Sequence, residues 1–209
     1  NNDPVGGLGL ILVERQDGYE TCDIEKMGLN SQSTAQVSFQ DVRVPKTNLM
    51  VPPGEAMKTL LISLSGSRPL VSLMALGVAQ ASLDESVSYA QDRTQFGKPI
   101  AGHQLISAKI GEMATKVEAG KLLALKALSQ IDRGERSDLC AAMSKWFGTQ
   151  MACEVVSEAL QIHGGNGITK EYPVEYMYRA VRPFMVTEGT NEIQKLSIGR
   201  ALTGIDAFG

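Results

Sequence analysis

The sequence predicts a mainly α-helical protein, in which an up-and-down four-helix-type bundle follows part of an antiparallel β domain. Polar and apolar residues alternate over the first fifty residues, as in half-buried strands. The Pro52-Pro53-Gly54 sequence then interrupts the chain, because proline is excluded from helix interiors. Beyond it, apolar residues recur at helical spacing in long segments joined by short turns. We therefore place a partial middle β domain at residues 1–53 and a helical bundle domain at 54–209.

The expected strands are short. Residues 9–13 form an apolar, β-branched run, residues 36–40 alternate, and residues 42–44 continue the alternation until Pro45 ends it. So few strands make a poor domain by themselves. We therefore expect this chain to be a fragment of a longer protein that supplies the other strands.

The helical part divides at its glycines and prolines. We expect helices over residues 55–65, 69–92, 104–133, 137–163 and 171–182, with a last helix after Thr190. Pro69 is expected to open the second helix, Gly134 to cap the third and Pro183 to end the fifth. Two apolar faces are expected: Ile106, Ile110, Met113 and Val117, and Ile193, Leu196, Ile198 and Leu202.

Composition excludes several classes of function. The 209 residues carry a net charge of −3 with scattered basic residues, which argues against nucleic-acid or membrane-surface binding. We see no apolar run long enough to cross a bilayer. The three cysteines lack metal-site spacing and are expected to be reduced, buried thiols, and two histidines make a zinc site improbable. We therefore expect an ordinary globular protein without a metal.

The most informative segment surrounds Glu188, which directly precedes Gly189 and the helix that begins at Thr190. Glycine permits a sharp bend, and threonine is a good N-cap. A carboxylate at such a bend, beside free backbone N–H groups, is a candidate general base. The alternative is an acidic residue favoured by the helix dipole, and the local pattern leaves both open.

Three further segments are candidates for ligand binding. Residues 93–100, followed by His103 and Gln104, form a corner that is either a nucleotide site or an exposed turn. Residues 161–167 contain three glycines whose amides can approach a pyrophosphate, although the same pattern suits a helix C-cap. Arg68 lies at an expected helix break, where it could reach an anionic or carbonyl group of a ligand.

Taken in order, these segments resemble the acyl-CoA dehydrogenase family. The matching stretches are residues 26–28, 39–45, 93–100, 103–104, 161–167, 172–175, 178–179 and 187–194. The resemblance covers essentially the whole chain and corresponds to the second half of the family's middle β domain and all of its C-terminal helical domain.

The resemblance implies a reaction and its base. Glu188 would remove the α-proton of an acyl-CoA thioester while the β-hydrogen leaves as hydride to the N5 atom of FAD, giving a trans-2-enoyl-CoA. Some members carry the base at the position of Ser67, which cannot serve. The implied acyl-CoA contacts are Ser65, Gly66, Ser67, Arg68 and Gly189. Ser65 replaces an acidic residue often found there, so the resemblance does not carry over the contact of that residue to the CoA adenine. Thr187 replaces a common tyrosine, which implies a reshaped acyl pocket.

The resemblance also implies FAD contacts from two subunits. Thr190, Asn191 and Glu192 would approach the FAD of the same subunit. The neighbouring subunit would contribute Arg93, Thr94, Gln95, Phe96, His103 and Gln104 to the adenosine-diphosphate part, and Gln161, Ile162, His163, Gly164 and Gly165 to a second contact. Shared sites imply a homotetramer, built as a dimer of dimers.

Electron-transfer flavoprotein is the implied electron acceptor, fatty-acid β-oxidation the implied setting, and the bacterial cytoplasm is favoured over the mitochondrial matrix. Two alternatives stay open: a non-catalytic structural or assembly subunit of the same fold, and an acyl-CoA oxidase. We expect the fragment alone to be inactive and to hold FAD weakly.

Overall fold

A computed structural model describes residues 6–207 of the chain. The chain divides into two compact units, one up to Leu64 and one from Ser65. The division falls inside helix α1 (Ala56–Asp92), not at the predicted domain boundary between residues 53 and 54. That boundary stays a prediction.

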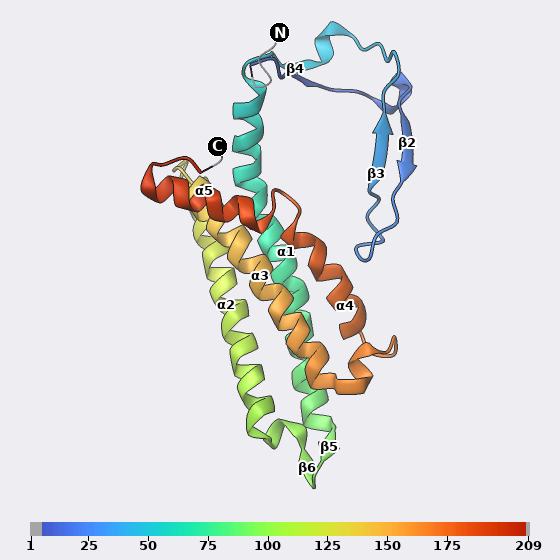
Figure 1. Cartoon of the computed structure of the whole chain (residues 1–209), viewed down its shortest axis with the longest axis vertical. Helices are drawn as coiled ribbons and strands as arrows, with labels where there is room; N and C mark the ends of the chain where they lie inside the picture. The colour runs from blue at the N-terminus through green and yellow to red at the C-terminus, as the bar shows by residue number, and fades with distance from the viewer. Residues whose placement is uncertain (1–5, 208–209) are drawn as a thin grey trace. The chain divides into compact units, whose positions relative to one another are not determined.

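The first unit contains two antiparallel strand pairs (Figure 1). Strand β1 (Leu10–Ile11) pairs with β4 (Leu49–Val51), and β2 (Glu20–Asp23) pairs with β3 (Ala35–Ser38). The strand expected at residues 42–44 is wrong, since those residues belong to no strand. The sequence pattern does not predict β2, because all four of its residues are exposed and apolar residues do not alternate along it.

Residues 6–64 of this unit form no hydrophobic core of their own. Among residues 6–64, only Gly28 and Ala56 are buried, while large apolar side chains such as Phe39 and Met50 are exposed. Cys22 is also exposed, so the expectation of three buried thiols is wrong for it, whereas Cys140 and Cys153 are partly buried and all three are free. Two isolated strand pairs cannot exclude water from an apolar layer.

The second unit confirms the predicted helical bundle. Its elements are the remainder of α1, the hairpin β5 (Thr94–Gln95) and β6 (Lys98–Pro99), α2 (Gln104–Asp132), α3 (Asp138–His163), α4 (Val174–Val181) and α5 (Asn191–Thr203). Helix α3 is central, with contacts to α2, α4 and α5. Figure 1 shows α1, α2 and α3 running alongside one another within this unit.

Glycines allow α1 to approach its neighbours closely. A Cβ at Gly148 of α3 would lie 1.9 Å from the Ser72 Oγ, and a Cβ at Gly120 of α2 would lie 2.8 Å from the Leu76 Cδ2. The Ser72 hydroxyl donates to the Ser144 carbonyl across the same contact. The backbone of α2 and α3 therefore lies directly against Ser72 and Leu76 of α1, which leaves little room for substitution of either glycine.

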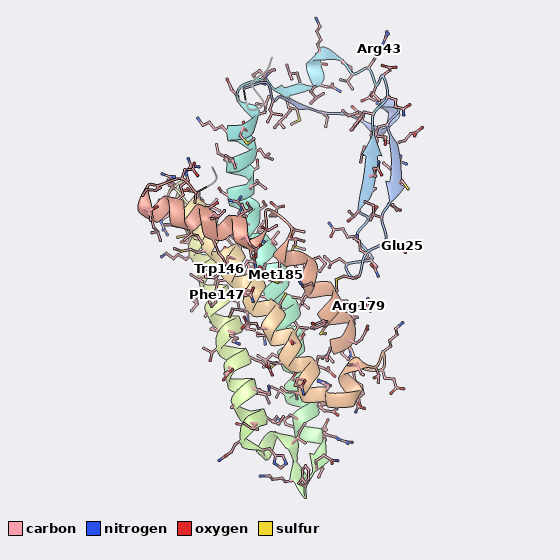
Figure 2. All side chains as sticks on the ribbon, in the orientation of Figure 1. Glu25, Arg43, Trp146, Phe147, Arg179 and Met185 are labelled. Carbon is pink, nitrogen blue, oxygen red and sulfur yellow. The ribbon has the colours of Figure 1, made fainter. Side chains whose placement is uncertain are left out.

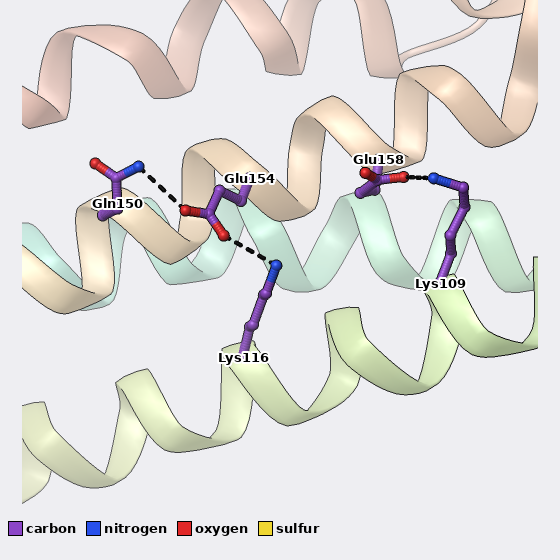
Figure 3. A network of polar contacts seen from close by, with 5 residues as sticks. All are labelled: Lys109, Lys116, Gln150, Glu154 and Glu158. Atoms are coloured by element: carbon purple, nitrogen blue, oxygen red, sulfur yellow. Dashed lines mark hydrogen bonds and ion pairs between the residues drawn. The ribbon is translucent and has the colours of Figure 1, made fainter.

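Polar contacts join α2 to α3 at the bundle surface (Figure 3). Lys109 pairs with Glu158, and Lys116 pairs with Glu154 at 2.9 Å, while Gln150 donates to the same Glu154 carboxylate. These side chains are about one-third exposed, so each pair contributes roughly 0–1 kcal/mol. The network fixes the register of the two helices more than it stabilises the fold.

The predicted break at residues 66–68 is wrong. Helix α1 runs without interruption through Pro69, which is almost fully buried. Proline removes one backbone hydrogen bond inside a helix. Packing of buried residues on the following turns, including Ser72, Ala75 and Leu76, outweighs that local loss.

The expectation that no apolar run reaches bilayer length is also wrong. An 18-residue window of α1 has a mean hydropathy of 1.4, with 28% of the window buried in this chain. Core helices of ordinary bundles meet the same criteria, so the finding is weak evidence for a membrane. Within this helix Arg68 and Ser72 are buried in polar contacts.

The C-terminal helices differ from prediction in bounds and in buried face. Pro173 occupies the N-cap of α4, so this helix begins at Val174 rather than at residue 171. In α5 the buried residues are Asn191 and Gln194, whereas Ile193, Leu196 and Leu202 are exposed. The predicted apolar face of α5 is therefore not its buried face, because polar contacts at its first turn orient it. In α2, by contrast, Met113 and Val117 are buried as expected.

Candidate active site

Glu188 lies in a strained bend between the short 3-10 helix η5 (Arg182–Met185) and α5. Its φ is +58° and that of Gly189 is +89°, so two consecutive residues adopt the left-handed conformation. This region is unfavourable for a glutamate and persists only where the surrounding structure holds it. Thr190 then caps α5, since its hydroxyl accepts from the backbone N–H of Ile193, as the sequence predicts.

The Glu188 side chain is half-buried and directed toward α1. Ser67 Oγ donates a 2.7 Å hydrogen bond to Glu188 Oε2. On the next residue, Arg68 Nε donates to the Glu188 carbonyl at 3.3 Å. Helix α1 therefore holds both the carboxylate and the backbone of this residue.

Arg68 is itself buried, so its guanidinium has lost most of its water. This burial lowers the pKa of Arg68, while the negative charges of Glu188 and Asp138 act in the opposite direction. From the sequence we expect Arg68 to reach a ligand. In the structure its guanidinium donates a hydrogen bond to the Glu188 backbone carbonyl. Ser65 and Gly66, also expected to contact acyl-CoA, lie half-buried on the preceding turn of α1.

Helix α5 holds the same bend from the other side. Gln194, which is fully buried, donates from Nε2 to the carbonyls of Glu188 and Gly189 at 3.2 and 3.1 Å. A Cβ at Gly189 would lie 2.9 Å from that nitrogen. Glycine is therefore needed here both for its φ and for the close approach of Gln194.

Of the three residues predicted to approach the FAD of the same subunit, Asn191 is buried and Glu192 is exposed. The Asn191 side chain is buried, and its Oδ1 accepts hydrogen bonds from Lys145 and Thr149 of α3. Glu192 is exposed in the first turn of α5, where its own backbone N–H and the Thr190 hydroxyl lower its pKa. Any contact of Asn191 with a flavin must therefore come from its backbone.

A second region lies at the corner between α1 and α2, where a cavity of about 620 Å³ opens. Aromatic rings and one cation surround it: Tyr89, Arg93, Phe96, His103 and His163. Phe96 is 93% exposed and meets the His103 ring edge-on, with centroids 6.1 Å apart. Phe96 and Gly97 adopt positive φ at the tip of the β5–β6 hairpin, which presents the ring outward.

The glycines at the end of α3 line the same cavity. Gly164 caps the helix with a φ of +58°, so glycine there has a conformational reason. Gly165 has no such φ, and a Cβ on it would meet no atom within 4 Å. Among residues 6–207 no atom would obstruct a side chain at position 165, so the backbone there is accessible from the cavity. An arginine, aromatic rings and glycine backbone around one cavity are the kinds of group that bind a nucleotide diphosphate.

The wall behind the cavity is an aromatic cluster. Tyr89 stacks on His163 with centroids 4.2 Å apart, and Tyr172 meets both rings edge-on. His163 Nδ1 donates to the Ala159 carbonyl, and Asn166 Nδ2 donates to the hydroxyls of Tyr89 and Tyr172. These contacts make His163 part of the rigid wall.

The structure assembles most but not all of the predicted cofactor residues at this corner. Arg93, Gln95, Phe96, His103, Ile162, His163, Gly164 and Gly165 line the cavity. Thr94, Gln104 and Gln161 are exposed and stand outside its lining. Their predicted contacts stay predictions.

The corner and the Glu188 bend lie far apart within one chain. Ser67 and Asp92 mark the two regions on α1, and 25 residues at about 1.5 Å each separate them by roughly 37 Å. The structure therefore gathers the Glu188 group beside the middle of α1 and most of the predicted corner residues at the C-terminal end of α1, and it separates the two groups.

Sequence reasoning missed Lys145 and Gln194. Lys145 is fully buried on α3, and its ammonium donates to Met185 and Asn191, the residues at the two ends of the Glu188 bend. A signal was present, because Ala141, Ala142, Gly148 and Ala152 mark a small-residue helix face that contains this lysine. A lysine on a buried face needs a specific partner.

Comparison with known proteins places the chain among flavoenzymes. Residues 57–203 match the acyl-CoA dehydrogenase C-terminal domain. A probable acyl-CoA dehydrogenase of Bacillus subtilis is 41% identical over 182 residues, which are 87% of this chain and 48% of that protein. The caffeyl-CoA reductase–Etf complex subunit CarC of Acetobacterium woodii is 41% identical over 198 residues, covering 94% and 52%.

Solved structures of acyl-CoA dehydrogenases share the fold of this chain. Butyryl-CoA dehydrogenase from Megasphaera elsdenii superposes with a TM-score of 0.94 at 35% identity, covering 97% of this chain and 53% of its own. A glutaryl-CoA dehydrogenase from Mycobacterium smegmatis, in complex with FADH2, gives a TM-score of 0.85 at 30% identity, covering 92% and 50%. The chain thus spans about half the length of the relatives it matches. By its matched domain and its fold, the chain belongs to the acyl-CoA dehydrogenase family, whose members are FAD enzymes.

Proposed function

We propose that the protein, in its full-length form, removes the α- and β-hydrogens of an acyl-CoA thioester to give a trans-2-enoyl-CoA, with Glu188 as the base. The observation that supports this most is the restraint on Glu188. Its carboxylate accepts from Ser67, and its carbonyl accepts from Arg68 and Gln194, in a backbone conformation that glutamate rarely adopts. Strain of this kind is typical of functional sites.

The chemistry assigned to this chain is a proton transfer. The α C–H bond breaks, its electron pair becomes the new C=C bond, and the proton goes to a Glu188 carboxylate oxygen. FAD, when bound, accepts the β-hydrogen with its electron pair as hydride. A half-buried carboxylate at a fixed position supports such a transfer because orientation and partial exclusion of water both aid general-base catalysis.

We assign the residues around Glu188 to binding and orientation. Gly189, which lies beside the base, is placed against the thioester. Ser67 and Arg68 of α1, with Ser65 and Gly66 before them, form the wall on the acyl-CoA side. Thr190 and Glu192 at the mouth of α5 face the flavin through the backbone and the Thr190 hydroxyl.

The corner cavity supports a second role in an assembly. Its separation of roughly 37 Å from Glu188 is too large for both groups to serve one flavin site in a single chain. We infer that the corner holds the adenosine-diphosphate part of the FAD of a neighbouring subunit, in a homotetramer. Shared cofactor sites of this kind require symmetric oligomers. Electron-transfer flavoprotein is the proposed electron partner, in line with one relative named as a subunit of an Etf complex and one similar structure titled for an electron transferring flavoprotein.

The test is the Glu188→Gln variant of the FAD-loaded full-length protein, mixed anaerobically with acyl-CoA. The amide keeps the shape of the side chain but cannot take the proton. We expect FAD content to stay unchanged and flavin bleaching to slow by roughly 10²-fold or more. Bleaching at the unaltered rate would remove Glu188 from the mechanism.

A second candidate is the reverse reaction. Two relatives at 40–41% identity are named 3-(aryl)acrylate reductase and caffeyl-CoA reductase subunit. The same geometry would then return a proton from Glu188 to the α-carbon of an enoyl-CoA, and reduced FAD, when bound, would supply the hydride to the β-carbon. Rates measured in both directions, with acyl-CoA and with the corresponding enoyl-CoA, distinguish the two.

A further inference from the structure

Lys145 occupies an unusual environment in the middle of α3. Its side chain has no exposed surface, and it is the largest fully buried side chain among the described residues. Its Nζ donates to the Met185 carbonyl and to Asn191 Oδ1, both at 2.9 Å, and neither partner is charged. Burying an ammonium opposite neutral oxygens is costly, so its retention needs an explanation.

The lowered pKa of Lys145 is consistent with the cost of burying its charge. Burial, together with the positive charge of Arg68, lowers the pKa of Lys145 to about 8, and the negative charges of Glu192 and Glu188 limit the shift. The charged groups that face this lysine are therefore the same residues that surround the bend.

The two partners of Lys145 flank Glu188. Met185 is the last residue of η5, and Asn191 is the first residue of α5. Figure 2 labels Met185 together with Trp146, the residue that follows Lys145 on α3. One buried ammonium thus ties both ends of the five-residue segment 186–190 to α3, the central helix of the bundle.

A second residue of α3 reinforces this tie. Thr149, one turn after Lys145, lies with its Oγ1 3.0 Å from the same Asn191 Oδ1, and its single hydroxyl hydrogen is shared between that oxygen and the Lys145 carbonyl at 2.8 Å. Both donors therefore converge on one oxygen of Asn191. In the described part of the chain, the Asn191 Nδ2 has no partner, so the amide is oriented by its oxygen alone.

Two layers of contacts then support the bend. Arg68 and Gln194 hold the carbonyls of Glu188 and Gly189 directly, and Lys145 fixes the segment ends on which those contacts depend. Consecutive left-handed residues do not hold their conformation alone. A displacement of about 1 Å at a reacting group can cost roughly 10²-fold in rate.

We propose that Lys145 is a positioning residue, which anchors the segment 186–190 to α3 and thereby fixes where the Glu188 carboxylate meets the substrate. Lys145 touches neither acyl-CoA nor FAD in this role. The inference rests on the proposed function, because it assumes that Glu188 is the base.

The experiment compares Lys145→Met with Lys121→Met in the FAD-loaded full-length protein. Methionine keeps the length of the lysine side chain but donates no hydrogen bond. Lys121 is a matched control, since it is a half-buried lysine whose Nζ donates to Gln80 Oε1 between α2 and α1. Thr149→Val provides a milder change, which removes one of the two donors to Asn191.

Two readouts separate positioning from a general structural effect. Amide hydrogen exchange, followed by mass spectrometry on peptides covering residues 183–194, reports the order of the bend. Exchange of the acyl-CoA α-protons with D2O, followed by NMR at saturating acyl-CoA, reports proton abstraction, and the Kd for acyl-CoA is measured separately.

For Lys145→Met we expect amide exchange over residues 183–194 to quicken by about tenfold or more. We expect α-proton exchange to slow by about 10- to 100-fold, with the Kd changed by less than about threefold. Thr149→Val should show the same pattern at about 3- to 10-fold, and Lys121→Met should match the unaltered protein. If Lys145→Met does not fold, Thr149→Val decides the question alone.

Glu188→Gln separates the two hypotheses. If it exchanges α-protons at the unaltered rate, the proposed function fails. If it loses exchange while Lys145→Met and Thr149→Val keep both the unaltered rate and unaltered protection of residues 183–194, the positioning role of Lys145 is overturned and the base assignment stands.

Discussion

Ser67 and Glu188 are 121 positions apart in the sequence, yet the Ser67 hydroxyl donates a 2.7 Å hydrogen bond to the Glu188 carboxylate. The contact joins the middle of α1 to the bend before α5. It turns the carboxylate toward the bundle rather than toward bulk water, and the neighbouring Arg68 holds the carbonyl of the same residue. The centre of the site is therefore the contact between α1 and the bend before α5. Substitutions in the bend or in the helices that pack around it test its stability.

Gly189→Ala tests the bend itself. Alanine disfavours a φ of +89°, and its Cβ would lie 2.9 Å from Gln194 Nε2. We expect a loss of about 1–3 kcal/mol in the free energy of unfolding, measured by urea denaturation, together with slower flavin bleaching. Gly199→Ala in α5 is the control, since its Cβ meets no atom within 4 Å; equal stability of the two variants would contradict the prediction.

Gly148→Ala tests the close approach of α1 and α3. The added methyl would overlap Ser72 Oγ at 1.9 Å, so the helices must separate or the serine must move. We expect destabilisation of about 1–3 kcal/mol, seen as a lower Tm. Gly111→Ala in α2 meets open space and should instead stabilise by up to about 1 kcal/mol, because alanine favours the helix. A Tm for Gly148→Ala at or above that of Gly111→Ala would refute the packing argument.

Phe96→Ala tests the corner cavity as a cofactor site. Because this ring is 93% exposed, its loss should change the free energy of unfolding by less than about 0.5 kcal/mol. Loss of a flat stacking surface should weaken FAD binding by about tenfold in a titration of the flavin-free full-length protein. Phe96→Tyr keeps the ring and should bind FAD normally. Unchanged affinity of the alanine variant would mean that the corner does not hold FAD.

The buried ammonium of Lys145 predicts a pH dependence of stability. Its pKa is lowered from 10.5 to about 8 in the folded protein, so between these values the unfolded chain binds more protons than the native one. Under that condition the free energy of unfolding rises with pH. We expect the stability of the unaltered protein, relative to Lys145→Met, to increase by up to about 3 kcal/mol from pH 8 to 10.5.

Urea denaturation of both proteins across that range measures the difference, and taking the difference removes the effect of the other titrating groups. A difference that stays constant with pH would show that Lys145 keeps its ordinary pKa.

Much of the local structure was predictable from sequence because its causes are local. The end of α3 at Gly164, the positive φ at Gly134 and the N-cap at Thr190 each depend on a residue type and its immediate neighbours. The α2 face containing Met113 and Val117 follows from the helical period alone. The order of the motifs likewise sufficed to indicate the family.

Tertiary structure decided what depends on distant partners. Pro69 predicts a helix end locally, but packing of the following turns keeps α1 continuous. Ile193 and Leu196 mark an apolar face locally, but the polar contacts of Asn191 and Gln194 bury the other side of α5. In both cases long-range packing outweighs a local preference.

The sequence alone singled out the residues to which we assign the chemistry: a glutamate before a Gly-Thr helix start, and an aromatic and glycine-rich corner. Only the folded chain decided how they are held, because Ser67, Arg68 and Lys145 reach the 185–191 segment from helices that are distant in sequence. Helical periodicity specifies which face of each segment is apolar, whereas the partner of a buried polar group is set by the way whole helices pack together.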